Sequence, residues 1–337
     1  MTDKKLNIGV IGAGRIGKLH ASNLVNRIPR ANLVAISDVN LKGAQELAQS
    51  LGVKDAYQDH HEILSRKDID AVLICAPTDM HSPISIEAAR AGKHILCEKP
   101  IDHDLGKIQQ VLDEVEKAGV KYQVGFNRRF DRNFKKVRER VQKGDVGAVH
   151  IVKVTSRDPA PPPAEYVKSS GGIFMDMTIH DFDMVRYLTG SEVEEVSVFA
   201  TVLVDSAIGE AGDVDTCIIN LRFKNGALGV IDNSRQAVYG YDQRVEVFGS
   251  KGCVTADNET ADNTVLYTAD AVTCEKPLWF FLERYNEAFV EEVKGFVDAC
   301  LDGKDTLVGA FDGLQPVKIA QAAKKSHELG GAPVKVQ

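Results

Sequence analysis

The sequence predicts two domains: an N-terminal α/β domain with a parallel sheet, then an α+β domain with a large, mainly antiparallel open sheet. Three observations support this fold class. The chain has 337 residues, more than one hydrophobic core usually organises. Short apolar runs alternate with helical stretches as far as Gly125, and longer strand-like runs follow Gln142. We therefore expect domains over residues 1–125 and 126–337.

The first domain is expected to repeat a strand–helix unit. Its strands read as nearly unbroken apolar runs, which is typical of a parallel sheet covered on both faces. The expected strands are 6–11, 33–36, 71–75, 94–97 and 122–125. The expected helices run through Leu19 and Leu24 and over 41–51, 84–91 and 105–118.

The second domain is expected to begin with a helix over 134–142 and to continue with strands. The expected strands are 149–155, 193–204, 216–223, 228–234 and 243–248. Asn225-Gly226 is a strong hairpin signal, and Ser250-Lys251-Gly252 suggests a second turn. Two later helical stretches, 283–301 and 312–328, could pack on this sheet or return to the first domain, and the sequence leaves both open.

Composition excludes several classes of protein. The formal net charge is −7 and the basic clusters are short, which argues against nucleic acid as a partner. The N-terminal apolar run is too short for a signal peptide, and no stretch approaches the roughly 18 apolar residues of a membrane span. We expect a cytoplasmic protein. Its six cysteines form no C-x-x-C pair, which predicts free thiols and no metal site.

A glycine-rich turn follows the first expected strand. It reads Gly12-Ala13-Gly14-Arg15-Ile16-Gly17 and opens a helix, with Asp38 at the end of the next strand. This context predicts a dinucleotide site, in which the backbone at Gly14 approaches the pyrophosphate. The alternative, a merely tight strand-to-helix connection, leaves the position of Asp38 as coincidence. Since Asp38 would bind the ribose hydroxyls and repel a 2′-phosphate, NAD is favoured over NADP.

Two further segments are expected at the same edge of the sheet. Thr78 and His81 follow the strand that ends at Cys75, and both are candidates for cofactor contact, although His81 reads equally well as a histidine at a helix start. Glu98 and Lys99 follow the strand over 94–97, where a nicotinamide would lie. Lys99 could donate a hydrogen bond to a hydroxyl oxygen that becomes alkoxide-like, whereas a strand-end lysine alone is usually a solvated surface residue.

A polar stripe follows Gly171-Gly172. Asp176, His180 and Asp183 lie at i, i+4 and i+7, so on one helix they would share a face, among apolar neighbours. A polyhydroxylated substrate would supply their partners. His180 is the natural general base, and Asp176 could orient it or hold a substrate hydroxyl. The alternative is a helix whose polar residues bind only the fold.

The glycine-rich turn, the segment 91–100 (Ala-Gly-Lys-His-Ile-Leu-Cys-Glu-Lys-Pro) and the Asp176-x-x-x-His180 helix together resemble the glucose-fructose oxidoreductase/inositol dehydrogenase (Gfo/Idh/MocA) family, over nearly the whole chain. Residues 125–131 and 239–242 look most like its inositol dehydrogenases. The resemblance implies NAD-dependent oxidation of one hydroxyl of myo-inositol, scyllo-inositol or both to an inosose, with Lys99, Asp176 and His180 as the catalytic group.

The resemblance also implies binding of the polyol and assembly of the chain. The implied hydroxyl-binding residues are Arg128, Asp158, Asp183, and Tyr239 or Tyr241. The implied assembly is a homotetramer formed through the open face of the second sheet. Ser156 and Asp158 depart from the family pattern, which leaves the preferred isomer open. An aldose dehydrogenase of the same family is the alternative enzyme, and an NAD-binding sensor without chemistry is the alternative of another class.

Overall fold

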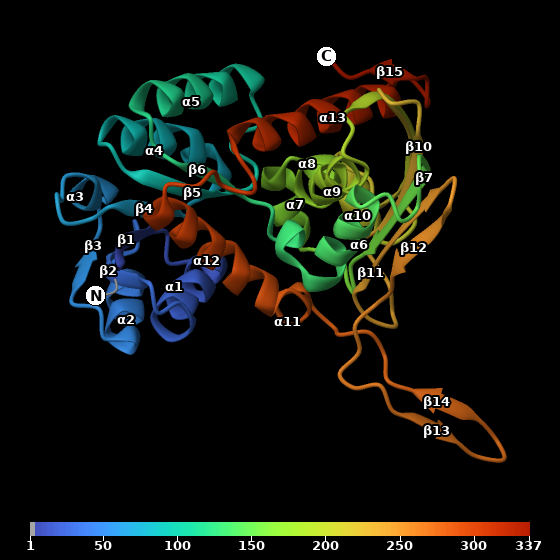
Figure 1. Ribbon diagram of the computed structural model, residues 1–337, viewed down its shortest axis with the longest axis horizontal. Helices are drawn as coiled ribbons and strands as arrows, with labels where there is room; N and C mark the ends of the chain where they lie inside the picture. The colour runs from blue at the N-terminus through green and yellow to red at the C-terminus, as the bar shows by residue number, and fades with distance from the viewer. Residues whose placement is uncertain (1–3) are drawn as a thin grey trace. The chain divides into compact units, whose positions relative to one another are not determined.

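The computed structural model describes residues 4–337. These residues form two compact units, whose elements are labelled in Figure 1. Unit 1 comprises the chain up to Phe130 together with Glu287–Val317, and unit 2 comprises Asp131–Asn286 together with Lys318–Gln337. The expected division into residues 1–125 and 126–337 therefore differs from these units, because residues 287–317 also belong to unit 1.

Unit 1 is built on a six-stranded parallel sheet in the order β3-β2-β1-β4-β5-β6. The strands are β1 (Leu6–Ile11), β2 (Ala31–Ser37), β3 (Asp55–Tyr57), β4 (Ala71–Ile74), β5 (His94–Glu98) and β6 (Tyr122–Gly125). Every residue of β4 is buried, as expected for a strand covered on both faces. The order reverses between β1 and β4, and the carboxyl ends of strands at such a point form the usual ligand site of this fold.

Helices complete unit 1. They are α1 (Arg15–Arg27), α2 (Leu41–Leu51), α3 (His60–Leu64), α4 (Thr78–Arg90), α5 (Leu105–Ala118), the 3₁₀ turn η1 (Asn127–Phe130) and α12 (Asn286–Asp302), while α13 (Ala310–Glu328) begins in this unit. The question left open by the sequence is settled for α12. Its side chains Val293, Phe296 and Val297 belong to the same buried apolar cluster as Val10 of β1 and Leu24 of α1.

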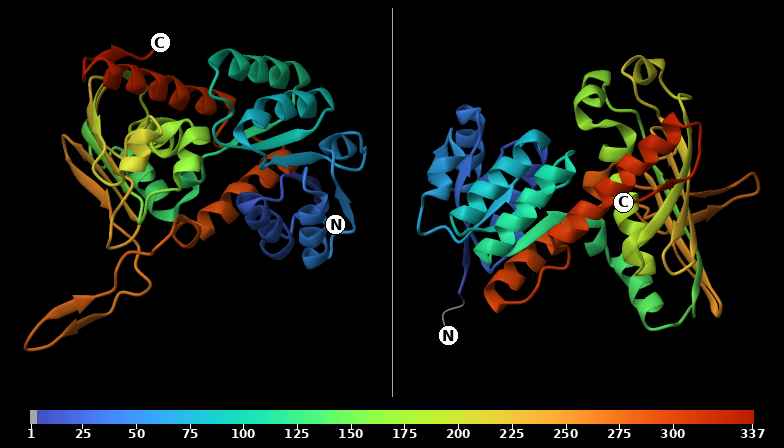
Figure 2. Two further views of the ribbon diagram at one scale, coloured as in Figure 1. Left: turned by 180° about the vertical axis from the view of Figure 1, so that it is seen from behind. Right: turned by 90° about the horizontal axis from the view of Figure 1, so that it is seen from above.

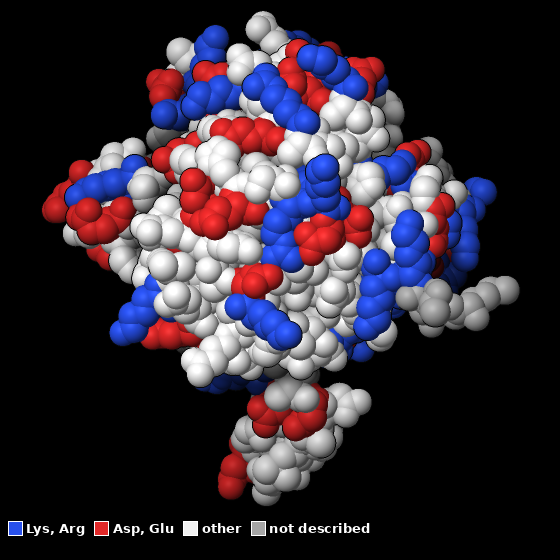
Figure 3. Space-filling model, turned by 90° about the vertical axis from the view of Figure 1, so that its left-hand side faces the viewer, with Lys and Arg blue, Asp and Glu red and all other residues white. Residues whose placement is uncertain are grey.

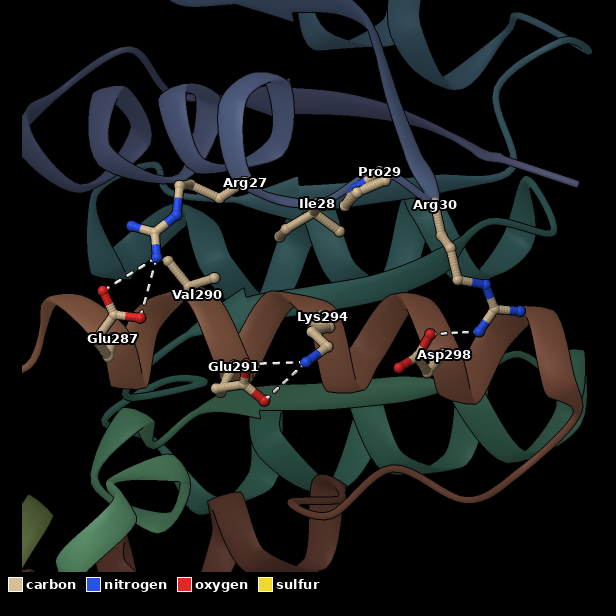
Figure 4. A pocket seen from close by; sticks show the side chains of 9 residues that line it. All are labelled: Arg27, Ile28, Pro29, Arg30, Glu287, Val290, Glu291, Lys294 and Asp298. Carbon is tan, nitrogen blue, oxygen red and sulfur yellow. Dashed lines mark hydrogen bonds and ion pairs between the residues drawn. The ribbon is translucent and has the colours of Figure 1, made fainter. Parts of the chain in front are cut away.

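Ion pairs flank this apolar contact (Figure 4). Arg27 of α1 lies 3.0 Å from Glu287, and Arg30 pairs with Asp298 of α12. Arg30 also pairs with Asp302, at the end of α12. These side chains are partly exposed to solvent, so the pairs add little to stability, and burial of the apolar face of α12 dominates its packing. The pairs line an open pocket in which each charged side chain faces an opposite charge.

Unit 2 is built on a seven-stranded sheet in the order β12-β11-β7-β10-β9-β8-β15. The strands are β7 (Val149–Arg157), β8 (Val193–Thr201), β9 (Thr216–Phe223), β10 (Leu228–Ser234), β11 (Asp242–Gly249), β12 (Gly252–Ala256) and β15 (Val334–Lys335). Neighbours are antiparallel except β7 and β10, which confirms a mainly antiparallel sheet. The hairpin at Asn225-Gly226 is also confirmed, and Gly226 has a positive φ of 86°. β13 (Val265–Tyr267) and β14 (Val272–Cys274) form a separate hairpin.

One face of the second sheet is covered by helices, as the edge-on view in Figure 2 shows. The helices of unit 2 are α6 (Arg132–Gln142), α7 (Ala164–Ser170), α8 (Gly172–Asp176), α9 (Ile179–Thr189), α10 (Ser206–Glu210), α11 (Phe281–Arg284) and the end of α13. The opposite face exposes large apolar side chains, namely Ile151, Phe199, Ile218, Leu228 and Phe248. We call this the open face.

Two general properties of the described residues bear on the composition argument. None of their helices is long and apolar enough to cross a membrane. Basic and acidic side chains are interspersed over the face of the molecule drawn in Figure 3.

Candidate active site

The glycine-rich turn has the geometry that a dinucleotide requires. Gly12 has a φ of +104°, and a Cβ there would lie 2.5 Å from the carbonyl oxygen of Cys75. A Cβ at Gly17 would lie 1.9 Å from the carbonyl oxygen of Gly12, so both positions need glycine. A Cβ at Gly14 would meet no protein atom within 4 Å. The space beside Gly14 is therefore open to a ligand.

Helix α1 begins at this turn without a side-chain cap. Gly14 is its N-cap residue and has no side chain to cap the first turn, which starts at Arg15 and Ile16. The first N–H groups of a helix carry partial positive charge and have no partner within the helix. The turn thus fits the pyrophosphate of NAD on the geometry of its own backbone.

Asp38 follows β2 beside the turn. One oxygen of its carboxylate accepts a hydrogen bond from the backbone N–H of Ala13 at 2.6 Å, and the other accepts from Asn40 at 2.8 Å. The side chain is only partly buried. Asp38 is thus held at the edge of the nucleotide turn, where its negative charge opposes a 2′-phosphate.

His81 is buried near the end of β4, with 2% of its surface exposed. Its Nδ1 lies 2.7 Å from the carbonyl oxygen of Pro100, and its Nε2 lies 2.8 Å from that of Ala76. Because both neighbours only accept hydrogen bonds, both ring nitrogens must donate, which requires the imidazolium. Burial lowers the pKa of His81, but Cys97 and the two carbonyls raise it more, to about 9. The ring therefore ties two loops together, while Thr78 begins α4, which also lacks a side-chain cap.

β5 ends at Glu98, directly before Lys99. The Glu98 carboxylate lies 2.8 Å from Nε2 of His20, and a Cβ at Gly125 would lie 2.8 Å from its other oxygen. The carboxylate of Glu98 is thus turned into the protein. Lys99 is partly buried, and the Lys99–Pro100 peptide bond is cis.

The expected continuous helix through Asp176 and Asp183 is wrong in one respect. Asp176 is the last residue of α8, whereas His180 and Asp183 belong to α9. The helix breaks at Thr178, whose hydroxyl donates a 2.6 Å hydrogen bond to the Asn233 side chain, and Asn233 in turn donates to Asp181. Polar side chains on the covered face of the sheet thus fix the junction between α8 and α9.

Arg235 binds two of the expected site residues, and the sequence analysis did not predict this role. Its guanidinium donates hydrogen bonds to Asp158 at 3.2 Å and to Asp176 at 3.1 Å, and its side chain is 4% exposed. Burial lowers the pKa of Arg235, but the charges of Asp176 and Asp158 raise it more, above its ordinary value. Tyr166 donates a 2.9 Å hydrogen bond to the other oxygen of Asp176. The Asp176 carboxylate is therefore held from two sides.

The remaining expected residues lie in different surroundings. Arg128 is 5% exposed in η1 of unit 1, and Asp183 is 1% exposed beside Arg186, at 3.7 Å. Tyr241 is also buried. Tyr239 donates a 2.6 Å hydrogen bond to Asp242, whose side chain belongs to the open face of the sheet.

Comparison with known proteins matches both the N-terminal and the C-terminal part of the chain to family models. Residues 6–126 match the model of the oxidoreductase family with an NAD-binding Rossmann fold, and residues 134–255 match that of the GFO/IDH/MocA C-terminal domain. The chain is 52% identical to the myo-inositol 2-dehydrogenase of Thermotoga maritima over 96% of both chains. It is 45% identical to the inositol 2-dehydrogenase of Rhizobium meliloti, over 95% of this chain and 96% of that one.

A solved structure agrees with these sequence comparisons. The scyllo-inositol dehydrogenase of Lactobacillus casei, solved with bound NAD(H) and scyllo-inositol, superposes with a TM-score of 0.93 at 31% identity. The match covers 99% of each chain. The chain is therefore a member of the GFO/IDH/MocA family of oxidoreductases and has an NAD-binding Rossmann domain.

Proposed function

We propose that this protein is an NAD-dependent inositol 2-dehydrogenase, which oxidises myo-inositol, scyllo-inositol or both to 2-keto-myo-inositol. The observation that carries the proposal is the 52% identity, over nearly the whole chain, to a myo-inositol 2-dehydrogenase. The open nucleotide turn at Gly14 and the anchored Asp38 carboxylate support the choice of cofactor.

Unit 1 holds the cofactor in this proposal, and unit 2 supplies most of the substrate contacts and the assembly surface. The backbone of residues 12–17 binds the pyrophosphate, Asp38 binds the adenosine ribose, and Thr78 with the segment at Glu98 and Lys99 borders the nicotinamide. Bound NAD supplies the acceptor of the hydride. Since both ring nitrogens of His81 are used by carbonyl oxygens, its role is to order these loops rather than to bind the cofactor.

Lys99, Asp176 and His180 form the proposed catalytic group. His180 takes the hydroxyl proton on a ring nitrogen, as its ordinary pKa near neutrality allows. The ammonium of Lys99 donates a hydrogen bond to the same hydroxyl oxygen and stabilises its developing negative charge. Asp176 holds a substrate hydroxyl or orients His180, and Arg235 is a positioning residue that fixes the Asp176 carboxylate.

The other ring hydroxyls, which both donate and accept, bind to side chains of complementary kinds. The proposed set is Arg128 as a donor, Asp158 and Asp183 as acceptors, and the hydroxyl of Tyr239 or Tyr241. Asp158 is the best supported member, because Arg235 holds its carboxylate and that of Asp176 on one guanidinium. Paired carboxylates of this kind suit adjacent hydroxyls of a polyol.

The test is NADH formation by the purified protein with NAD and, separately, myo-inositol, scyllo-inositol and glucose. Turnover with an inositol supports the proposal and identifies the preferred isomer. Activity with glucose alone would place the enzyme among aldose dehydrogenases. NAD binding without turnover on any of the three would favour a sensor. Lys99→Ala should bind NAD and lose turnover, and full turnover of that variant would reject the assigned role of Lys99.

The protein is further proposed to form a homotetramer through the open face. Ile151, Leu228 and Phe248 lie side by side there, because Ile151 pairs with Phe248 of β11 and with Leu228 of β10. An exposed apolar surface of this kind is typical of a protein interface. Light scattering on wild type and on Phe248→Asp tests the assembly, and a monomeric wild type would reject it.

A cytoplasmic location is also part of the proposal. All six cysteines are free thiols, and those of Cys75, Cys217 and Cys300 have pKa values raised chiefly by burial. Unreactive thiols of this kind suit a reducing compartment. Fractionation of cells that express the protein tests this location.

A further inference from the structure

Glu292 is an acidic side chain in the interior of unit 1. It lies on α12 with 0% of its surface exposed, and neither carboxylate oxygen has a hydrogen-bond partner in the described part of the chain. Its neighbour Glu291 points outward, with half of its side chain exposed, and pairs with Lys294. An ionised carboxylate buried without a partner is strongly unfavourable, so the burial of Glu292 needs an explanation.

Glu292 faces two polar groups from other elements. A ring nitrogen of His20 on α1 and one carboxylate oxygen from each of Glu98 and Glu292 lie within 4.8 Å of one another. His20 and Glu98 are themselves joined at 2.8 Å. We call these three residues the acid–histidine cluster. It brings α1, β5 and α12 together at the end of the strand that precedes Lys99.

The cluster cannot hold two ionised carboxylates without cost, because like charges in a buried site disfavour each other. Burial, and then the charge of Glu98, raise the pKa of Glu292 well above its ordinary value. Another titratable group affected by this charge is Cys75, whose thiol pKa is raised by burial first and by Glu98 and Glu292 among other groups. Gln123 donates a 3.0 Å hydrogen bond to the backbone carbonyl of Glu292 and adds no charge.

We propose that Glu292 is a positioning residue for Lys99: as a neutral acid it donates a hydrogen bond toward the Glu98 carboxylate, which His20 holds from α1. Glu98 is then fixed between two helices, and with it the end of β5. Lys99 follows in the chain, so the backbone position from which its ammonium extends is fixed as well. This inference rests on the catalytic role proposed above for Lys99.

Three variants test the proposal. Glu292→Gln keeps the shape and a donor without a charge, Glu292→Leu removes the polar group, and Glu291→Gln on the exposed side of α12 is the matched control. For each, the measurements are kcat and KM for inositol from mildly acidic to alkaline pH, the dissociation constant of NADH and the unfolding temperature.

Glu292→Gln is expected to keep kcat within about twofold at neutral pH, because a neutral amide can replace a neutral acid. Glu292→Leu is expected to lower kcat by roughly tenfold or more through misplacement of Lys99, with little change in NADH affinity. Wild type should lose activity at alkaline pH as Glu292 ionises, and Glu292→Gln should lack this loss. Glu291→Gln should match wild type throughout.

Three results would overturn the proposal. Equal loss of kcat in Glu292→Gln and Glu292→Leu would mean that the carboxylate works in its ionised form. One equivalent of a transition metal that elemental analysis finds in wild type and not in Glu292→Leu would make the cluster a metal site instead, whereas metal retained in that variant would belong to Asp59, His60 and His61. Wild-type kcat in a folded Glu292→Leu would show that the cluster does not position Lys99.

A failure of the proposed function gives a different result. If Lys99→Ala kept full turnover, the role of Lys99 would be rejected whatever the Glu292 variants do. The protonation of Glu292 would still be tested by stability, because Glu292→Gln should gain unfolding temperature relative to wild type as the pH rises. A constant difference across pH would reject the neutral acid.

Discussion

The ring of His81 bridges two loops of the parallel sheet, with Nδ1 2.7 Å from the carbonyl oxygen of Pro100. Its other nitrogen lies 2.8 Å from the carbonyl oxygen of Ala76. The loop after β4 is thereby tied to the segment that carries Lys99. Because this bridge needs the imidazolium, its strength depends on pH.

Stability should fall at alkaline pH through this histidine. The folded pKa of about 9 is raised above the ordinary value of 6.5, so the folded state binds the proton more tightly. The contribution is therefore complete below the ordinary pKa and is lost as the pH rises through about 9. Urea unfolding of wild type and His81→Leu should differ by about 2–4 kcal/mol below neutrality, because two buried carbonyls lose their donor.

The control for His81→Leu is a substitution at a histidine that is not buried. His61 on α3 is 60% exposed, and the hydrogen bond with Asp59 raises its pKa. Solvent weakens this exposed pair, so His61→Gln should leave the loss of stability near pH 9 almost unchanged. If the difference between wild type and His81→Leu stays constant from neutral to strongly alkaline pH, then His81 is not an imidazolium in the folded protein.

Substitution of an outer glycine of the nucleotide turn should lower stability, whereas substitution of the middle glycine should weaken NADH binding. Gly17→Ala places a methyl group 1.9 Å from the Gly12 carbonyl oxygen, so the turn must shift and stability should fall. Gly14→Ala meets no protein atom within 4 Å and should unfold within about 2 °C of wild type. Its methyl group enters the space proposed for the pyrophosphate, so NADH should bind at least about tenfold more weakly. Unchanged NADH affinity in Gly14→Ala would place the pyrophosphate elsewhere.

Cofactor preference should depend on the charge of Asp38. Asp38→Asn keeps an oxygen that can accept the hydrogen bond from the Ala13 N–H but removes the negative charge. The ratio of kcat/KM for NAD to that for NADP should fall by about tenfold or more, because a 2′-phosphate is no longer repelled. The kcat/KM values for NAD and NADP are measured with the same inositol, for wild type and for Asp38→Asn. An unchanged ratio would assign the discrimination to another residue.

Local patterns predicted much of this fold. Unbroken apolar runs located five of the six parallel strands, and β3 was missed because it has only three residues, none fully buried. β8 ends at Thr201, earlier than expected, because the Asp215 carboxylate accepts hydrogen bonds from the backbone of Leu203, Val204 and Asp205. Contacts between residues distant in the chain leave no such local pattern.

In the candidate site too, the sequence predicted features with a local pattern and missed those that depend on distant contacts. The Gly12–Gly17 turn and Asp38 have a fixed spacing, so they could be found from the sequence. Arg235 could not be found from the sequence, because its role depends on contacts with Asp158 and Asp176, which are distant in the chain. Glu292 is likewise one acidic residue among several on α12 until the fold buries it beside Glu98.

The partners of Arg235 make it the most informative residue to change in unit 2. Arg235→Met leaves the carboxylates of Asp158 and Asp176 without their shared cation, and losing one partner of a buried ion pair costs about 3–5 kcal/mol. Arg235→Lys keeps the charge but lacks the fork that reaches two carboxylates. Arg235→Lys should therefore stay folded and lose kcat by about tenfold or more as Asp176 moves.

Arg140 provides the control, because it lies on α6 with 53% of its side chain exposed. Arg140→Lys should keep both kcat and the unfolding temperature. If Arg235→Lys were folded and fully active, the direction of the Asp176 carboxylate would not limit turnover. A rise in KM for inositol with unchanged kcat would instead assign the Arg235 network to substrate binding alone, because uniform loss of binding leaves the chemical step untouched.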